Sequence, residues 1–293
     1  MSGDALGPAA LQQLAFVGRL DELTRLGDLG DLAVEQGAQM VLLSGDAGIG
    51  KSTLTTQFLE QLTEAGWGTH IGHCIEYADR SLPFGPVVAL MRSVLLDNLE
   101  HVDLLVGHHR DDLAGLLPEL GGEADTASFA GDVDRLFDAI ASTIIQAANR
   151  RPLALVIEDV HWADAATRDV IASLVHSLGK ARVLLIVTER SAAVEKTHPL
   201  RTWLAEQRRF PNVHSLELEG LGQAELAEQA ESILGESPAP KFVAHLLERT
   251  AGNPYFAHEL LVAKAAGSDE LPTSLKEFLT SRLELLGEDE RAV

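Results

Sequence analysis

The glycine-rich run at residues 45–52, which reads GDAGIGKS, constrains the fold of this chain more than any other sequence feature. Its spacing fits G-x-x-x-x-G-K-[ST], and it stands between an apolar strand pattern and a helical pattern, as a P-loop does. Glycine lets backbone N–H groups curl around phosphate oxygens, and the following helix adds its positive N-terminal end. The alternative is a glycine-rich turn with a chance lysine, but strand, loop and helix occurring together argue against it. The sequence therefore predicts an α/β fold with a phosphate-binding site at a strand end.

Two side chains of this run carry chemistry beyond the backbone cradle. The ammonium of Lys51 would reach the β- and γ-phosphates of a nucleotide, and the hydroxyl of Ser52 would be a magnesium ligand. We therefore expect a nucleoside di- or triphosphate with Mg²⁺ as the ligand. The residues assigned to nucleotide binding in and beside this run are Gly45, Asp46, Ala47, Gly48, Ile49, Gly50, Lys51, Ser52 and Thr53.

A second element, LALVIEDVHWAD at residues 153–164, places acidic residues at the end of an apolar strand. A P-loop site needs one carboxylate for the magnesium shell and a base that orients the attacking water. Glu158 and Asp159 are the candidates for catalysis and for metal binding, because ligands of open α/β folds bind at the carboxyl edge of the sheet. Adjacent strand residues point to opposite faces, so the two differ in role, and the sequence leaves open which one holds the metal. A solvated acidic pair is the alternative, and Asp164 is expected to cap the following helix.

A third apolar strand ends in Thr188-Glu189-Arg190. Arg190 is a candidate for contacting the γ-phosphate and reporting its presence. An ordinary surface salt bridge is the equally weighted alternative. Arg208 and Arg209 could act across a subunit boundary, but a solvated helix end is the expected role for both.

Short apolar runs alternate with helical patterns through most of the chain, which is typical of a parallel sheet with helices on both faces. The segment at residues 78–128 is long for one crossover and is expected to be a helical insertion. Five strands are expected, at residues 40–45, 69–75, 153–159, 182–188 and 213–218. The helices between them are expected at residues 51–65, 84–99, 129–149, 164–178 and 199–209.

Only helical periodicity follows Leu218, which predicts a small all-helical module after the sheet domain. Asn253 and Pro254 read as the N-cap and first residue of one of its helices. The last helix has an apolar face that needs a cover, so we expect the sequence to be part of a longer protein. The expected helices lie at residues 224–234, 241–250, 255–266 and 274–286.

The formal net charge of −21, from 44 acidic and 23 basic residues, disfavours binding to nucleic acid and to anionic membranes. No apolar run is long enough to span a bilayer, and the N-terminus lacks the pattern of a signal peptide. The single cysteine, Cys74, is expected to be a small buried hydrophobe and fits a reducing compartment. The sequence thus predicts a cytoplasmic protein with no direct DNA binding by this segment and no membrane association.

Six elements occur in an order that resembles a known family. They are FVGR at 16–19 with Glu22-Leu23 after it, GDAGIGKST, IEDVHWAD, VTER, GNPYF at 252–256 and LPTSLKEFLTSRLELL at 271–286. Together they resemble the STAND class of signalling ATPases, and in particular the ATPase region of the large ATP-binding LuxR-type transcriptional regulators of bacteria. The P-loop alone is unspecific, whereas HWAD after the acidic strand combined with the later GNP is fairly specific.

The resemblance implies an ATP-driven switch, with ATP or ADP and Mg²⁺ as ligands and with sensor and effector domains further along the same chain. It implies that Val17 and Arg19 line the base and phosphates, that Arg190 is the γ-phosphate sensor and that Pro254 packs near the adenine. An ATP-dependent homo-oligomer is a possible active form. The implied organisation is an N-terminal segment (1–15), a P-loop nucleotide-binding domain (16–220), a helical lid (221–272) and the truncated start of a winged-helix domain (273–293).

Three functions compete at this point. The first is a regulatory ATPase that turns over slowly and changes partners with its nucleotide state. The second is an AAA-type motor or loader acting on DNA or protein, which would need a trans-acting arginine and, for DNA, a basic path. The third is a small-molecule kinase, which would need an acceptor pocket and a basic closing lid. The acidic charge and the absence of an arginine-rich lid in the sequence favour the first.

Overall fold

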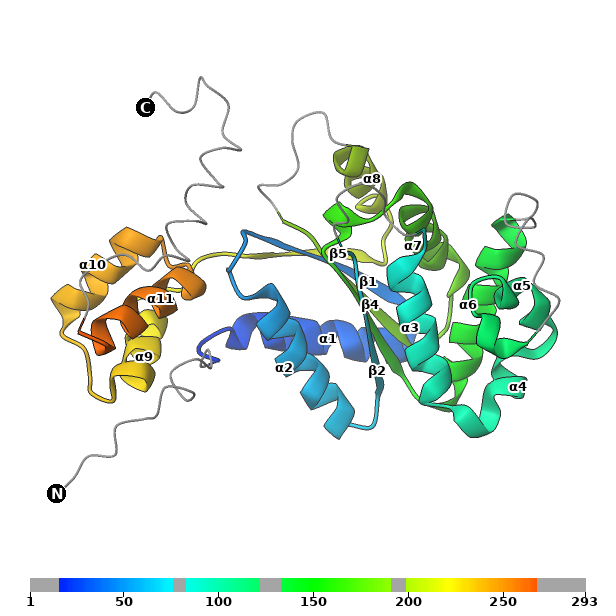
Figure 1. Cartoon of the computed structure of the whole chain (residues 1–293), viewed down its shortest axis with the longest axis horizontal. Helices are drawn as coiled ribbons and strands as arrows, with labels where there is room; N and C mark the ends of the chain where they lie inside the picture. Colours follow the sequence, from blue (N-terminus) through cyan, green and yellow to red (C-terminus); the bar gives the residue numbers. More distant parts are fainter. Residues whose placement is uncertain (1–15, 76–82, 122–132, 191–198, 268–293) are drawn as a thin grey trace. The chain divides into compact units, whose positions relative to one another are not determined.

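The structure, a computed structural model, describes most of the chain (Figure 1). The described ranges are residues 16–75, 83–121, 133–190 and 199–267. They form two compact units. Within the described ranges, the sheet unit consists of residues 20–46 and 51–218, and the helical unit of residues 16–19, 47–50 and 219–267.

The sheet unit is built on five parallel strands in the order β2-β3-β4-β1-β5, which confirms the predicted α/β fold (Figure 1). Every residue of β1 and β4 is buried, as is every residue of β3 except the last, because helices cover both faces. The strands are β1 (Gln39–Gly45), β2 (Gly68–His73), β3 (Leu153–Glu158), β4 (Val183–Thr188) and β5 (Val213–Leu218).

The strand register aligns the carboxyl ends at one edge of the sheet. Leu43 of β1 pairs with Thr188 of β4, and His73 of β2 pairs with Glu158 of β3. The P-loop run therefore leaves the sheet beside the end of β4, while the acidic pair leaves it beside the end of β2. The shared direction of the strands brings together segments that are far apart in the sequence.

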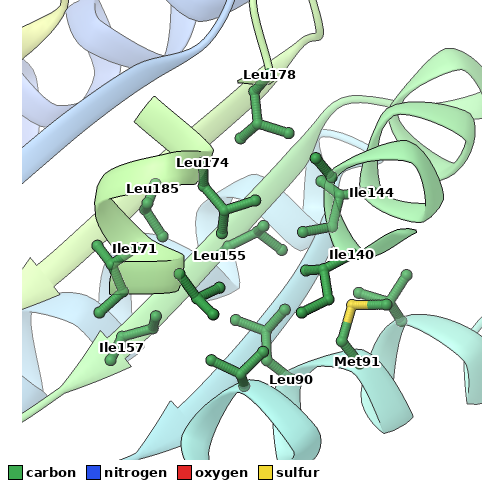
Figure 2. Packing of buried hydrophobic residues seen from close by; sticks show 14 of the residues in the cluster. Leu90, Met91, Ile140, Ile144, Leu155, Ile157, Ile171, Leu174, Leu178 and Leu185 are labelled. Atoms are coloured by element: carbon green, nitrogen blue, oxygen red, sulfur yellow. The ribbon is translucent and has the colours of Figure 1, made fainter. Parts of the chain in front are cut away.

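Alternate residues of the central strands pack into the core on one face of the sheet. Leu155, Ile157 and Leu185 meet aliphatic side chains from three helices there (Figure 2). Those helices are α3, α6 and α7, whereas α1 and α2 lie on the other face (Figure 1). Full burial of each such side chain stabilises the fold by roughly 1.5–3 kcal/mol, and it fixes the strand ends that carry the polar residues.

The helices of the sheet unit that follow β1 agree with the predicted alternation, with small shifts at their ends, whereas the helix before β1, α1, was not predicted. The predicted insertion is helical over its described part, where short helices and 3-10 turns follow α3. The longer helices are α1 (Leu20–Gln36), α2 (Lys51–Glu64), α3 (Gly85–Leu96), α6 (Val133–Arg150), α7 (Ala165–Ser177) and α8 (Pro199–Gln207). The short elements are η1 (Leu99–His101), α4 (Val102–Val106), η2 (Gly107–His109), α5 (Arg110–Ala114), η3 (Pro118–Leu120) and η5 (Val160–Trp162).

The helical unit contains α9 (Gln223–Leu234), α10 (Pro240–Thr250) and α11 (Pro254–Ala265). Its core is formed by apolar side chains of these helices together with Val17 and Leu221. Gly252, with φ +74°, lies so close to Leu221 that a Cβ would approach its carbonyl oxygen to 2.4 Å. Glycine is therefore required at the turn that leads into α11.

Two predicted segments fall outside the described residues: the N-terminal 1–15, and 273–293 with its expected last helix at 274–286. Among the residues that the structure describes, none of the helices is both long enough and apolar enough to cross a membrane.

Candidate functional site

Lys51 begins α2, and its side chain lies back over the carboxyl end of β1. Nζ donates hydrogen bonds to the carbonyl oxygens of Gly45 at 2.7 Å and Asp46 at 3.0 Å, and the residue is only 8% exposed. Burial lowers the pKa of Lys51, and the carboxylate of Asp159 opposes this shift more strongly than any other charge. The ammonium is therefore held by the loop backbone and coupled electrostatically to the acidic end of β3.

Thr55, one turn along α2, connects the start of this helix to the end of β3. Its buried hydroxyl Oγ1 lies 3.1 Å from the carbonyl oxygen of Lys51, 3.0 Å from that of Ser52 and 3.4 Å from Oε1 of Glu158. Ser52 and Thr53 are exposed on the same turn. The carboxylate of Glu158 therefore lies beside the turn of α2 that carries the predicted magnesium ligand Ser52.

Glu158, the last residue of β3, also contacts the neighbouring strand. Its Oε2 is 3.0 Å from Nδ1 of His73, which ends β2 and is largely exposed. The contact follows from the parallel register, which pairs these two residues directly. One carboxylate oxygen thus faces α2 and the other faces β2.

Asp159 has a different conformation and different neighbours. Its backbone is left-handed, with φ 57°, which is uncommon for a residue other than glycine and is found often at functional sites. Its N–H donates to Oγ1 of Thr188 at 2.9 Å, and its Oδ1 lies 3.8 Å from Nε of Arg190. The two acidic residues that the sequence could not separate therefore point into different surroundings, Glu158 toward α2 and β2 and Asp159 toward the end of β4.

Arg190 follows β4 and forms this ion pair with Asp159 while remaining partly exposed. The geometry thus joins a predicted phosphate sensor to a predicted catalytic carboxylate. Arg208 is also more than a solvated helix end, because its Nη2 is 3.4 Å from Oε1 of Glu189. Glu189 is 4% exposed, and burial raises its pKa while Arg208 and Lys51 partly offset the shift.

In the helical unit, Arg19 and Val17 have distinct environments. Val17 is buried in the core against α9, α10 and α11. Arg19 has φ 61° and is 7% exposed, and its Nη2 donates to the carbonyl oxygens of Ile49 at 3.1 Å and Glu219 at 2.7 Å. Its guanidinium group therefore binds the backbone of the P-loop run.

Asn253 is the N-cap of α11, as the sequence predicted, and Pro254 is the first helical residue. Oδ1 of Asn253 accepts from the N–H groups of Tyr255 at 3.1 Å and Phe256 at 3.4 Å. Pro254 is buried, its carbonyl oxygen accepts from Nε2 of Gln229 at 2.9 Å, and its Cγ is 3.8 Å from where a Cβ on Gly50 would lie. Asp164 likewise caps α7, accepting from the N–H of Thr167 at 2.9 Å.

The donor groups of the sheet unit fit the chemistry of a nucleotide phosphate chain with magnesium. Lys51 supplies a cation for phosphate oxygens, and Ser52 supplies an exposed hydroxyl at the start of α2. Glu158 and Asp159 supply hard oxygen ligands, of the kind that Mg²⁺ combines with phosphate oxygens. Sequence reasoning missed Thr55, His73 and Glu189, because their importance depends on contacts between segments far apart in the chain.

The chain is similar to a family model, to a curated protein and to solved structures. The family model of the AAA ATPase domain matches residues 15–187. A curated relative, uncharacterized protein R02095 of Rhizobium meliloti (strain 1021), is 25% identical over 192 residues, which is 60% of this chain. The chain spans only 18% of the length of that relative.

Three solved structures that are similar to the chain have low sequence identity to it. A signal transduction ATPase with numerous domains (STAND) from Pyrococcus horikoshii, PH0952, which has a tetratricopeptide repeat sensor, matches with TM-score 0.49 and 18% identity, over 95% of this chain and 34% of that one. A RuvB variant of Thermotoga maritima matches with TM-score 0.45 and 17% identity, over 97% and 76% of the two chains. Domain III of the DnaA protein of Thermotoga maritima matches with TM-score 0.45 and 13% identity, over 96% and 97%.

The family match covers more than half of the chain and includes both the P-loop run and the acidic end of β3. A domain of this family implies that the chain binds a nucleotide. The chain belongs to the AAA ATPase domain family.

Proposed function

We propose that this chain is the ATP-binding and slowly hydrolysing switch region of a bacterial signal-transduction ATPase, in a protein organised like a LuxR-type transcriptional regulator. The observation that carries the proposal is the clustering of Lys51, Glu158, Asp159 and Arg190 at the carboxyl edge of the sheet. ATP would bind with its phosphates at the P-loop run, and Lys51 would exchange its carbonyl partners for phosphate oxygens.

The two carboxylates would divide the chemistry. Glu158 is the proposed magnesium ligand together with Ser52, because Thr55 links its carboxylate to the first turn of α2. Bound magnesium would neutralise charge on the phosphate oxygens. Asp159 is the proposed base that orients the attacking water, because it lies on the side of Lys51 and Arg190.

The contacts of these carboxylates support slow turnover. Asp159 is paired with Arg190, and Glu158 is 3.0 Å from the imidazole of His73. Each carboxylate thus already has a partner that competes with the proton or the metal it would bind. Arg190 would move from Asp159 toward a γ-phosphate when ATP is bound, so that the arginine would distinguish ATP from ADP.

The helical unit would contribute the second half of the switch. Pro254 is proposed to pack near the adenine, and Val17 and Arg19 to support the loop and the base, as in the family that the sequence resembles. Sensor and effector domains elsewhere in the parent protein would then respond to the nucleotide state. A homo-oligomer formed with ATP would be the active form.

A steady-state phosphate-release assay with MgATP tests the proposal. We expect a slow basal rate that Lys51→Ala abolishes together with tight ATP binding, and no phosphoryl transfer to added sugars, nucleosides or peptides. Rapid turnover that DNA stimulates would instead favour the motor or loader. Transfer of the γ-phosphate to an acceptor would favour a kinase, and either result would overturn the switch.

A further inference from the structure

Three consecutive carbonyl groups of the P-loop run are bound by residues of the helical unit. The carbonyl oxygen of Ala47 accepts from Nδ2 of Asn253 at 2.9 Å, and that of Gly48 accepts from the N–H of Tyr255 at 3.3 Å. The carbonyl oxygen of Ile49 accepts from Nη2 of Arg19 at 3.1 Å. The donors come from both ends of the described chain, yet they all hold one four-residue segment, which clusters with the helical unit.

This arrangement matters because a phosphate cradle needs its N–H groups turned toward the ligand. When the N–H groups of successive peptides converge, their carbonyl groups are directed elsewhere and need partners of their own. Here those partners are protein groups held in place by burial, since Asn253 is 5% exposed and Arg19 is 7% exposed. The carbonyl side of the segment is thus fixed without any ligand.

Packing leaves the segment little freedom against the start of α11. Gly48 has φ +75°, and a Cβ there would lie 2.9 Å from Cβ of Tyr255 and 3.1 Å from Oδ1 of Asn253. Asn253 uses both ends of its amide, since Oδ1 caps α11 while Nδ2 binds the loop. One side chain therefore ties the beginning of a helix to the backbone of the P-loop.

We propose that Asn253 is a positioning residue that holds the P-loop in its phosphate-binding conformation from the carbonyl side, with Arg19 and the Tyr255 N–H completing the clamp. The proposal rests on the proposed function in so far as it takes this loop to bind phosphates. It differs from a contact with the base, because a clamp of this kind acts on the phosphate chain whether or not an adenine is attached. A change in the loop on phosphate binding would then be transmitted directly to the start of α11 through these contacts.

Substitutions at one position can separate the cap from the clamp. Asn253→Ser keeps an oxygen that can cap α11, but its hydroxyl is too short to reach Ala47. Asn253→Ala removes both interactions. Asp164→Ala is the matched control, because it removes the cap of α7 without touching residues 47–50.

Backbone ¹⁵N relaxation of the nucleotide-free protein is the first measurement. We expect Asn253→Ser to lower the order parameters of the amides at residues 47–50 from about 0.85, as in a rigid backbone, toward the value below about 0.6 of a flexible one. The rest of the helical unit should keep its wild-type order parameters, and Asp164→Ala should leave the loop unchanged. Unaltered order parameters at residues 47–50 in Asn253→Ser would overturn the clamp.

Binding of magnesium tripolyphosphate, a ligand without a base, is the second measurement. The clamp predicts that Asn253→Ser weakens tripolyphosphate and MgATP by the same factor, roughly three- to tenfold. A loss confined to MgATP would overturn the clamp, because Asn253 would then act through the adenine. Should wild-type protein bind neither ligand, the proposed function fails, while the relaxation experiment still decides whether the clamp exists.

Discussion

Glu158 and Asp159 are neighbours in the chain, but their carboxylates lie in different surroundings. Glu158 ends a regular strand and keeps the alternation of the sheet, so its carboxylate stays between α2 and β2. Asp159 turns into the left-handed region, which directs its carboxylate toward Arg190. The backbone conformation of one residue thus assigns two different environments to two similar side chains.

Amide substitutions should separate the two carboxylates. Asp159→Asn is expected to retain ATP affinity but to lower kcat about a hundredfold or more, because an amide is a poor base. Glu158→Gln is expected to raise the Mg²⁺ concentration needed for half-maximal turnover by roughly tenfold or more, because an amide is a poorer magnesium ligand. Magnesium titrations of phosphate release measure both effects. The reverse pattern would exchange the two assignments.

Arg190→Ala should reduce the ability of the protein to distinguish ATP from ADP. An arginine that reaches the γ-phosphate contributes to ATP binding only, so ATP affinity should fall several-fold more than ADP affinity. Competition titrations with a fluorescent nucleotide analogue measure the ratio of ATP affinity to ADP affinity. Arg92→Ala, which removes an exposed ion pair with Glu119, is the control. Equal losses for the two nucleotides would leave Arg190 with no sensor role.

At the level of elements, the sequence pattern predicted the strands and helix caps, because these features depend on local residue order. Fully apolar runs predicted β3 and β4, and small polar residues before helical patterns predicted the caps Asp164 and Asn253. The contacts of Thr55, His73 and Glu189 were not predictable, since each depends on which distant segments the sheet brings together. The left-handed turn at Asp159 was also missed, because aspartate is common in ordinary backbone conformations as well.

The packing of β2 against α3 should make stability depend on pH. His70 of β2 is buried with Nδ1 2.8 Å from Oγ of Ser93, and burial, with a smaller effect of Arg151, lowers its pKa from 6.5 to about 4. The unfolded chain therefore binds more protons between these values, so stability is lost as the pH falls from about 6.5 to about 4, by up to about 3 kcal/mol.

Urea unfolding at a series of pH values measures this loss. His70→Gln removes the titrating group, so its free energy of unfolding should vary less than that of the wild type over the same pH range. An identical pH dependence in the two proteins would contradict the assignment to His70.

For the whole molecule, net charge is the property that bears most directly on partners. With 44 acidic and 23 basic residues, this chain repels polyanions over long distances. A regulatory protein can separate nucleotide binding from DNA binding by placing them in different domains. In the proposed function, this chain would contain the nucleotide-dependent switch, and DNA binding would belong to another domain.

We therefore predict that this segment does not bind DNA. Fluorescence anisotropy with a labelled duplex at low salt is a severe test, because weak screening exaggerates electrostatic attraction. No saturable binding is expected below roughly 100 μM protein, the weak end of nonspecific affinities. Saturable binding in the micromolar range, lost on adding salt, would reveal a local basic surface and favour the loader.

The strand order also governs when the site can come into existence during synthesis. Gln39 of β1 pairs with Leu184 of β4, and Met40 pairs with Val213 of β5, so the strand that precedes the P-loop has no partner until the ribosome has made most of the domain. Pairing between such distant segments is slow, because a long loop must close first. A nascent chain that ends before β4 would contain the whole P-loop motif but neither of the strands that pair with β1. We expect such a chain to bind chaperones.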